Sequence, residues 1–233
     1  MKIWALSDPH FAFTSNKPMD IFGDGWQNYI DKIKENWQKK IKEDDLVLVA
    51  GDISWALKLE DAVADLNFLG TLNGTKIIIK GNHELWWSSL KKVREILPKS
   101  VIALQNDSYK IENVIICGTR GWASREINKP YTKEDEKIYA REVIRLELTL
   151  KDMEKKRKEG DKVVCMFHFP PFNSRHDDNE FTALFEKYKV NAVVFGHLHG
   201  KDARMEKMFV KNGVKYYLTS TDQINHDPVE IKI

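Results

Sequence analysis

The sequence has little of several features that assign a protein to a specialised class. It contains only two cysteines in 233 residues, Cys117 and Cys165, each within a short apolar run. Two such cysteines do not make a disulfide framework, so we interpret them as buried side chains of a protein in a reducing compartment and expect a cytoplasmic location. No stretch approaches the roughly 18 consecutive apolar residues of a membrane-spanning helix, and the apolar run at residues 1–7 is too short for a secretory signal.

Charge of one sign is not in excess either. The chain has 37 lysine and arginine residues against 35 aspartate and glutamate residues, which leaves a net charge of +2. This balance gives no support to nucleic-acid binding through a broad basic surface, although it does not exclude a local groove. The sequence also lacks linkers, repeats and low-complexity segments. With 42% hydrophobic and 31% charged residues, residues 1–233 are expected to form a single globular domain.

Buried strands that alternate with helices organise the first hundred residues. Three short apolar runs are typical of strands buried on both faces: residues 2–7, 46–50 and 76–80. After each of them, apolar residues at spacings of three and four predict a helix: residues 26–41, 59–69 and 86–97. Asp24 is the expected N-cap of the first helix. This alternation predicts a largely parallel sheet.

The rest of the chain predicts a second sheet that is more antiparallel. Its strands, with those that close the fold, are expected at residues 101–104, 109–112, 114–118, 162–167, 191–195, 204–210, 214–219 and 229–233. A long charged helix is expected over residues 132–159, with Thr132 as N-cap and Asp135 in the capping-box position. A shorter helix is expected over residues 181–189. Together these elements indicate a mixed α/β protein with two sheets.

Metal-binding side chains gather at the ends of the predicted strands. Five of the seven histidines follow a buried strand within a few residues: His10, His83, His168, His197 and His199. Asp8, Asp52 and Asn82 occupy the same kind of position. Open α/β sheets bind ligands at the carboxyl ends of their strands, so these side chains are expected to lie together. A lone histidine is usually a core or surface residue, but random placement would not put five of them at strand ends.

The residue types indicate which metals such a site would bind. Imidazole and carboxylate ligands without thiolate suit Mn²⁺, Fe or Zn²⁺ better than a cysteine-rich structural zinc site. Asp52 lies between the other strand ends, so its carboxylate could bridge two cations, and Asn82 offers a neutral carbonyl oxygen. Two metal ions roughly 3.5–4 Å apart can hold a hydroxide for in-line attack on phosphorus.

Five blocks of this pattern, in order along the chain, resemble the calcineurin-like metallophosphoesterases. The blocks are Asp8-x-His10, Gly51-Asp52, Gly81-Asn82-His83-Glu84, His168 and Gly196-His197-x-His199. One Gly-Asp pair would be uninformative, but five ordered blocks at strand ends are a specific signal. The resemblance spans residues 8–199. It implies a four-layer α/β/β/α sandwich of two mixed sheets flanked by helices, with a dinuclear metal site.

The resemblance also implies separate roles for these residues. The first metal would be held by Asp8, His10, Asp52 and His199. The second would be held by Asp52, Asn82, His168 and His197, with Asp52 as the bridge. His83 would face the scissile phosphate and either stabilise the transition state or protonate the leaving oxygen. Glu84 is expected to orient His83, to act as a favourable charge in the first turn of the following helix, or to do both.

The residues around the blocks bear on the substrate. Protein serine/threonine phosphatases of this superfamily carry an arginine soon after the Gly-Asp block, and residues 51–56 contain none. Its absence weakens a phosphoprotein-phosphatase function and leaves phosphodiesterase or small-molecule phosphatase activity open. We consider several residues as substrate contacts: Arg120, Arg125 and Arg175 as phosphate clamps, and Trp87 and Trp122 as walls of an apolar or base-stacking pocket.

The sequence is therefore interpreted as a metal-dependent phosphohydrolase. It would cleave a phosphomonoester or phosphodiester bond of a small molecule by attack of a metal-bound hydroxide on phosphorus. One alternative is a DNA nuclease of the same superfamily, but those enzymes tend to carry an added DNA-binding cap. The other is a non-catalytic interaction scaffold, but such proteins have lost ligands or the catalytic histidine, all of which are present here. No membrane partner is expected.

Overall fold

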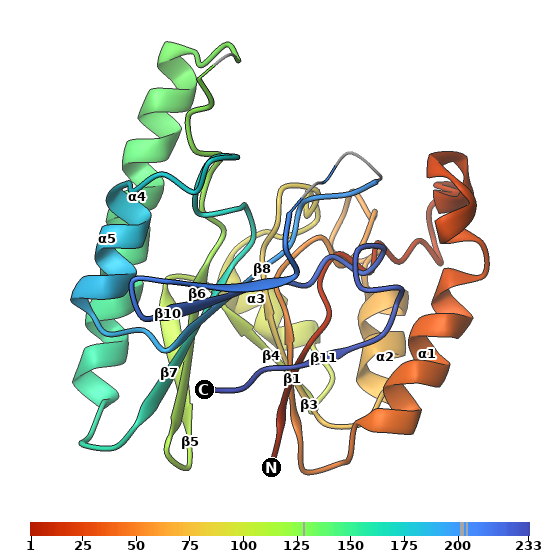
Figure 1. Ribbon diagram of the computed structural model, residues 1–233. Helices are drawn as coiled ribbons and strands as arrows, with labels where there is room; N and C mark the ends of the chain where they lie inside the picture. Colours follow the sequence, from red (N-terminus) through yellow and green to blue (C-terminus); the bar gives the residue numbers. More distant parts are fainter. Residues whose placement is uncertain (128, 201–202, 204) are drawn as a thin grey trace.

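Two β-sheets pack face to face in the computed structural model, and helices cover the outer face of each sheet (Figure 1). The structure describes residues 1–127, 129–200, 203 and 205–233. Its four layers, in the order helix, sheet, sheet, helix, confirm the fold class predicted from the sequence. Within the described residues, no helix is both long and apolar enough to cross a membrane.

The first sheet contains the three strands predicted in the first hundred residues and also the strand at residues 101–104, which was expected in the second sheet. In spatial order it consists of β11 (Val229–Glu230), β1 (Ile3–Ala5), β2 (Leu46–Val49), β3 (Thr75–Ile79) and β4 (Val101–Leu104). Strands β1 to β4 are parallel, and β11 pairs antiparallel with β1. The parallel sheet follows from the helical connections between consecutive strands, as expected.

The second sheet is mixed. In spatial order it consists of β5 (Asp107–Ile111), β6 (Val114–Thr119), β7 (Lys162–Phe167), β8 (Ala192–Phe195), β10 (Val214–Leu218) and β9 (Met208–Lys211). Its central strands β6, β7, β8 and β10 are parallel, and the antiparallel pairs lie at its two edges. Strand β9 begins at Met208 rather than at the expected residue 204, and Arg204 itself lies outside the described residues.

Five α-helices, counted over the described residues, form the outer layers (Figure 1). They are α1 (Tyr29–Lys40), α2 (Val63–Thr71) and α3 (Leu90–Ile96) on the first sheet, and α4 (Lys133–Lys156) and α5 (Glu180–Lys187) on the second. The capping box of α4 is present as predicted: the hydroxyl of Thr132 accepts the backbone N–H of Asp135 at 3.1 Å, and the Asp135 carboxylate accepts the N–H of Thr132 at 2.9 Å.

Three helices begin later than the apolar spacing predicted: α2 begins at Val63 rather than at residue 59, and α1 and α3 are displaced in the same direction. Asp24 lies in a short 3₁₀-helix (Asp24–Trp26) that follows another (Met19–Phe22), and the N-cap of α1 is Asn28. Trp86 lies before α3, whose N-cap is Ser89. In both places an apolar residue fits the helical spacing because it faces the core, although its backbone has another conformation.

Within the described residues, three apolar clusters separate the four layers. Alternate side chains of each strand belong to different clusters: in β3, Ile78 packs toward α1, α2 and α3, whereas Ile77 and Ile79 pack between the sheets. In β7, Cys165 packs toward α4 and α5, whereas Val164 packs between the sheets. Because both faces of each sheet are covered, the strands appear in the sequence as continuous apolar runs.

Candidate metal centre

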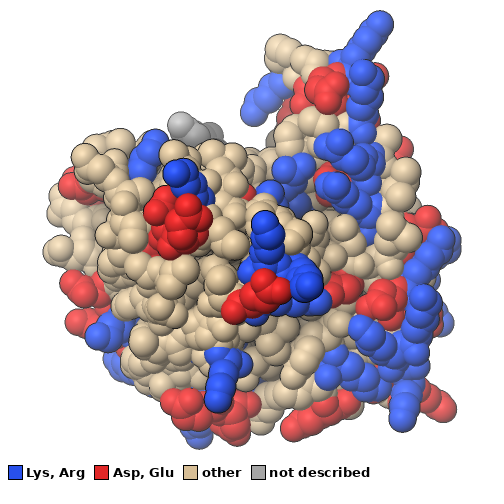
Figure 2. Space-filling view, turned by 180° about the vertical axis from the view of Figure 1, so that it is seen from behind, with Lys and Arg blue, Asp and Glu red and all other residues tan. Residues whose placement is uncertain are grey.

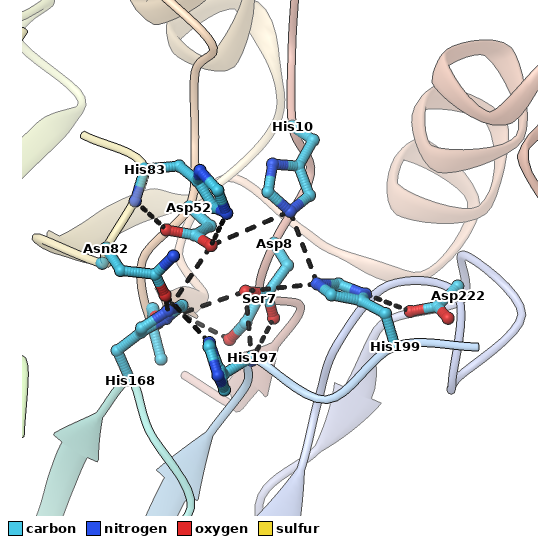
Figure 3. Close-up of polar contacts among 12 residues, drawn as sticks. Ser7, Asp8, His10, Asp52, Asn82, His83, His168, His197, His199 and Asp222 are labelled. Carbon is cyan, nitrogen blue, oxygen red and sulfur yellow. Dashed lines mark hydrogen bonds and ion pairs between the residues drawn. The ribbon is translucent and has the colours of Figure 1, made fainter. Parts of the chain in front are cut away.

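Strands from both sheets end at one edge of the molecule, and the polar residues that follow them meet there (Figure 3). The loops after β1, β2 and β3 carry Asp8, His10, Asp52 and Asn82, and the loops after β7 and β8 carry His168, His197 and His199. Figure 3 shows these side chains pointing toward one another. The structure thus brings together every residue predicted to bind a metal.

The first group that could hold a metal ion consists of Asp8, His10 and His199. One ligand atom of each lies within 4.8 Å of the others. The Nε2 atoms of His10 and His199 are 3.4 Å apart, and His199 Nε2 is 3.9 Å from Asp8 Oδ1. Burial lowers the pKa of His10 to about 3, so this imidazole is neutral at pH 7, which is the form that binds metals.

The second group consists of Asp52, His168 and His197, again with ligand atoms within 4.8 Å of one another. Burial and the neighbouring His168 lower the pKa of His197 to about 3, which keeps it neutral as well. The Asp52 carboxylate lies between the groups, because its Oδ2 atom is 3.4 Å from His168 Nε2 and 3.9 Å from His10 Nε2. Asp52 is therefore placed where one carboxylate could bridge two ions.

The donor set around Asn82 fits a cation. Nδ1 of His168 lies 2.9 Å from the carbonyl oxygen of Ala50, which can only accept, so Nδ1 carries the proton and Nε2 presents a lone pair. That lone pair lies 2.7 Å from Asn82 Oδ1, and His197 Nδ1 lies 2.8 Å from the same oxygen. The lone pairs of His168 Nε2 and Asn82 Oδ1 repel each other at this distance unless a positive charge lies between them. The residues present thus fit a divalent metal ion.

Asp222 orients His199 toward the first group. Its Oδ1 atom accepts the Nδ1–H of His199 at 2.7 Å, which leaves Nε2 of His199 facing Asp8 and His10. The other oxygen accepts the backbone N–H of Gly200 at 2.8 Å. Asp222 was not among the site residues predicted from the sequence. Asp222 follows the end of β10 just as Asp8 follows the end of β1. An acidic residue soon after a strand was therefore a signal that could have identified Asp222.

The loops that carry the ligands have unusual backbone conformations. Asp8, His10, Asp52 and His197 have positive φ angles of 55°, 47°, 51° and 71°. Residues other than glycine seldom adopt this conformation, which costs on the order of 1 kcal/mol each. Hydrogen bonds between the loops hold it: Asp8 N donates to the carbonyl of Gly51 and His10 N to that of Asp52, both at 3.0 Å. Each loop therefore fixes the shape of its neighbour.

Two glycines let the aspartates pack directly against bare backbone. A Cβ atom added to Gly81 would lie 2.2 Å from Asp52 Oδ1, and one added to Gly196 would lie 2.1 Å from Asp8 Oδ2. Both distances are far shorter than any contact between real atoms. The glycine in each of these two blocks is therefore required by the position of an aspartate from another loop.

Glu84 differs from the expectation. It is fully buried, and its carboxylate accepts the backbone N–H groups of Gly81 at 2.5 Å, Asp52 at 2.9 Å and Ile53. Because these donors occupy the carboxylate, Glu84 joins two ligand loops instead of orienting the His83 ring. It is not a first-turn helix charge either, because α3 begins only at Leu90. Glu84 is a positioning residue rather than a catalytic one.

His83 lies on the open side of the site. Its side chain is 43% exposed, and its Nε2 atom is 4.0 Å from Asp52 Oδ2. Its backbone N–H donates to Asp52 Oδ1 at 2.9 Å, and its ring packs on Trp55 with a centroid distance of 4.3 Å. His83 belongs to neither metal-binding group. Its position beside both groups and open to solvent agrees with the predicted contact with substrate.

Two tryptophans beside the first group, Trp55 and Trp26, were not among the predicted substrate contacts. Trp55 stacks on His10 with ring centroids 4.8 Å apart and an angle of 18° between the planes. Trp26 contacts the rings of His10 and His199 at 6.1 and 5.7 Å. Trp55 comes three residues after Asp52, so its distance in sequence from a ligand was a usable signal. No such signal exists for Trp26, because its spacing fits the apolar face of a predicted helix.

The residues predicted as substrate contacts lie in different surroundings. The indole of Trp87 is buried in the apolar cluster between the first sheet and its helices, and its N–H donates to the side chain of Gln105 at 2.8 Å. Its predicted role as a pocket wall is therefore wrong. The guanidinium of Arg120 pairs with Glu142 at 3.4 Å, and that of Arg175 pairs with Asp177 at 2.5 Å. Asp177 neutralises Arg175, which does not favour its predicted role as a phosphate clamp. Glu142, by contrast, also pairs with Arg145 at 2.6 Å, and the role of Arg120 stays a prediction.

Arg125 and Trp122 stay predictions as substrate contacts. Arg125 is exposed and lines a separate cavity of about 340 Å³ with Tyr131 and Asn179. Trp122 packs on Phe169 at 5.1 Å, and Phe169 in turn contacts the ring of His197 at 4.2 Å. One side chain, that of Phe169, thus lies between Trp122 and His197 of the second metal-binding group.

Two packed sheets with adjoining histidine and aspartate groups at their common edge define an α/β protein with a candidate metal centre. Comparison with protein families makes this class more specific. The model of the calcineurin-like phosphoesterases matches residues 1–201, most of the chain, and the protein belongs to that family. It is therefore a metal-dependent phosphoesterase, which confirms the resemblance and the enzyme class predicted from the sequence.

Solved structures of similar fold come from several bacteria. TT1561 of Thermus thermophilus is 11% identical with a TM-score of 0.56, and the match covers 99% of this chain and 97% of that one. Phosphopantetheinyl hydrolase (PptH) from Mycobacterium tuberculosis is 15% identical with a TM-score of 0.54, covering 94% and 88%. AQ665 from Aquifex aeolicus, a protein of unknown function, is 14% identical with a TM-score of 0.51, covering 98% and 95%. These identities show a shared fold alone. No curated protein matches the chain.

Proposed function

We propose that the protein uses two divalent transition-metal ions, Mn, Fe or Zn, to hydrolyse a phosphomonoester or phosphodiester bond of a small molecule. The observation that carries this proposal is the position of the Asp52 carboxylate, 3.4 Å from a histidine of one group and 3.9 Å from a histidine of the other. A carboxylate so placed suits two adjoining ions.

The residues would divide between the two ions as the family pattern implies. The first ion would be held by Asp8, His10, Asp52 and His199, and the second by Asp52, Asn82, His168 and His197. When bound, the ions would lower the pKa of a water molecule and neutralise charge on the phosphate. The chain itself supplies the imidazoles, and Ala50 and Asp222 orient those of His168 and His199.

His83 would act on the leaving group. Hydrolysis consumes one water: a bond from the water oxygen to phosphorus forms, the bond from phosphorus to the ester oxygen breaks, and the leaving oxygen gains a proton. His83 would donate a hydrogen bond or that proton to the leaving oxygen. Its half-exposed ring beside both metal-binding groups supports this role.

A small-molecule substrate is favoured over DNA. The net charge is only +2, and Figure 2 shows lysine and arginine side chains mixed with acidic ones on the face it displays. A nuclease would be expected to neutralise many phosphates with a basic surface. A scaffold function is disfavoured because His83 and every predicted ligand lie together. We further propose that residues 1–233 act as one domain in the cytoplasm, because both cysteines are buried and free.

The test combines metal analysis with a substrate panel. Protein purified without chelator should contain transition metal, and with added Mn²⁺ it should hydrolyse at least one class among phosphomonoesters, phosphodiesters, cyclic nucleotides and pyrophosphates. Absence of both metal and hydrolysis would refute the proposal. Salt-sensitive binding of DNA would favour the nuclease instead.

The variant His83→Ala tests the role of that residue. It should lower kcat about 10²- to 10⁴-fold while the metal content stays unchanged, because His83 is a proton donor and not a ligand. His176→Ala is a matched control, since His176 stacks on Phe209 outside the site. Unchanged turnover in His83→Ala would show that the assigned role is wrong.

A further inference from the structure

An apolar cavity opens directly beside His83 and the first metal-binding group. Its volume is about 290 Å³, and it is lined by Met19, Phe22, Trp26 and Trp55 together with His10, His83, His199 and Gly200. Its walls come from the two short 3₁₀-helices before α1 and from the loop after β2. The four apolar wall residues, Met19, Phe22, Trp26 and Trp55, are not predicted metal ligands, so they are not needed to hold the ions.

The walls have a defined arrangement of flat and apolar surfaces. Trp55 lies parallel to His10, at 18° and 4.8 Å, and its Nε1–H donates to the sulfur of Met19 at 3.1 Å. Trp26 is buried and contacts His10 edge-on. Phe22, by contrast, is 62% exposed at the mouth of the cavity, where it buries little surface of its own. An exposed phenylalanine at the rim of an apolar cavity is typical of a binding site.

The size of the cavity limits what it can hold. An engineered apolar cavity of about 150 Å³ accommodates one benzene ring. A cavity of about 290 Å³ therefore has room for a flat group of two fused rings. Its wall side chains, Met19, Phe22 and the two tryptophans, offer ring faces and a thioether rather than polar groups that would read the edge of a nucleobase.

The cavity on the other side of the centre has a different character. It reaches His197 and Phe169 and is lined also by Glu126, Lys129 and Asp135. The side of His197 thus mixes charged residues with apolar ones such as Phe172 and Leu198, whereas the lining of the cavity beside His83 contains no carboxylate, lysine or arginine.

We propose that the cavity lined by Trp55 and Phe22 binds the leaving alcohol of the substrate, and that this alcohol carries a flat, apolar, aromatic body of about two rings next to its ester oxygen. This inference rests on the proposed function, because the role of His83 at the leaving oxygen identifies which side of the phosphate the cavity serves. The group that stays on phosphorus, if the substrate is a diester, points to the side of His197.

Two esters with leaving groups of similar acidity test the inference. Phenyl and 2-naphthyl phosphate, or the methyl diesters of both if the enzyme cleaves diesters, differ mainly in one fused ring. About half of that ring would be buried, so kcat/KM should be about tenfold higher for the naphthyl ester. Phe22→Ala should reduce this preference about threefold, and Trp55→Leu, which keeps bulk but removes the flat face, should abolish it. Ile21→Ala is the matched control, because Ile21 is 71% exposed in the same 3₁₀-helix and does not line the cavity.

A binding measurement separates the inference from the proposed function. Calorimetry should show that chelator-treated protein binds 2-naphthol, and that Phe22→Ala binds it more weakly while Ile21→Ala does not. An active enzyme with equal kcat/KM for both esters, or with a naphthyl preference unchanged by Phe22→Ala and Trp55→Leu, overturns the inference and leaves the proposed function standing. Failure to hydrolyse any ester with metal present overturns the proposed function, and the 2-naphthol measurement still decides whether the cavity binds a flat apolar alcohol.

Discussion

Replacing Asp222 by asparagine should weaken metal binding at one of the two groups without unfolding the protein. The carboxylate accepts hydrogen bonds from His199 Nδ1 at 2.7 Å, from the N–H of Gly200 at 2.8 Å and from the Gln223 side chain at 3.1 Å. Asparagine has one oxygen and one NH₂ group. It cannot accept from His199 on one side and from Gly200 on the other, so one of these donors loses its partner.

The magnitude follows from the bond that is lost. A hydrogen bond to a charged group contributes about 1.5–3 kcal/mol, and a displaced His199 ring would transfer that loss to the metal. Removing the carboxylate partner of a histidine ligand typically weakens metal binding about 10- to 100-fold. We expect a decrease in this range at the group of Asp8, His10 and His199, and little change at the group of Asp52.

Metal titration against a chromophoric chelator measures this effect. The wild type and Asp222→Asn should differ in the affinity of one of the two ions, and excess Mn²⁺ should restore the activity of the variant. Asp227→Asn is the control, because Asp227 is close in sequence but pairs with Lys40 at the surface at 2.6 Å. If Asp222→Asn bound both ions as the wild type does, the positioning role of Asp222 would be refuted.

Two further predictions concern the loops that carry the ligands. Glu84→Gln should lower the free energy of unfolding by about 3 kcal/mol, since its NH₂ group would face backbone N–H donors; urea denaturation measures this, and a change below about 0.5 kcal/mol would contradict it. Gly81→Ala should reduce metal content, because its Cβ would overlap Asp52 Oδ1, whereas Gly25→Ala, with no atom within 4 Å of the added Cβ, should retain the metal content of the wild type. Equal metal content in both variants would count against the close packing at Gly81.

The α/β fold with two sheets was accessible from the sequence because it depends on local patterns, whereas its four layers were implied by the family resemblance. Each central strand, such as Ile77–Ile79 in β3, is covered on both faces and therefore appears as an uninterrupted apolar run. The ligands were accessible for a related reason. Parallel strands place their carboxyl ends together, so polar residues that follow different strands can be inferred to meet without knowledge of the contacts themselves.

The parts that were missed depend on contacts between distant segments. Trp26 and Trp55 both contact the ring of His10, but nothing in the 28 residues between them indicates that they share a cavity. Glu84 was misinterpreted because the sequence placed it before a helix, whereas its hydrogen bonds run to Asp52 and Ile53 in another loop. The exact partner of a buried carboxylate is a tertiary property, so spacing along the chain does not predict it.

Each metal-binding group draws on both sheets, and this links the ions to the assembly of the fold. Asp8 and His10 follow a strand of the first sheet, while His199 follows a strand of the second; Asp52 and His168 are divided in the same way. An ion bound to ligands from both sheets opposes their separation, and at a concentration 100 times its Kd it would stabilise the native state by about 2.7 kcal/mol. The metal concentration would then determine the stability of the folded enzyme as well as its activity.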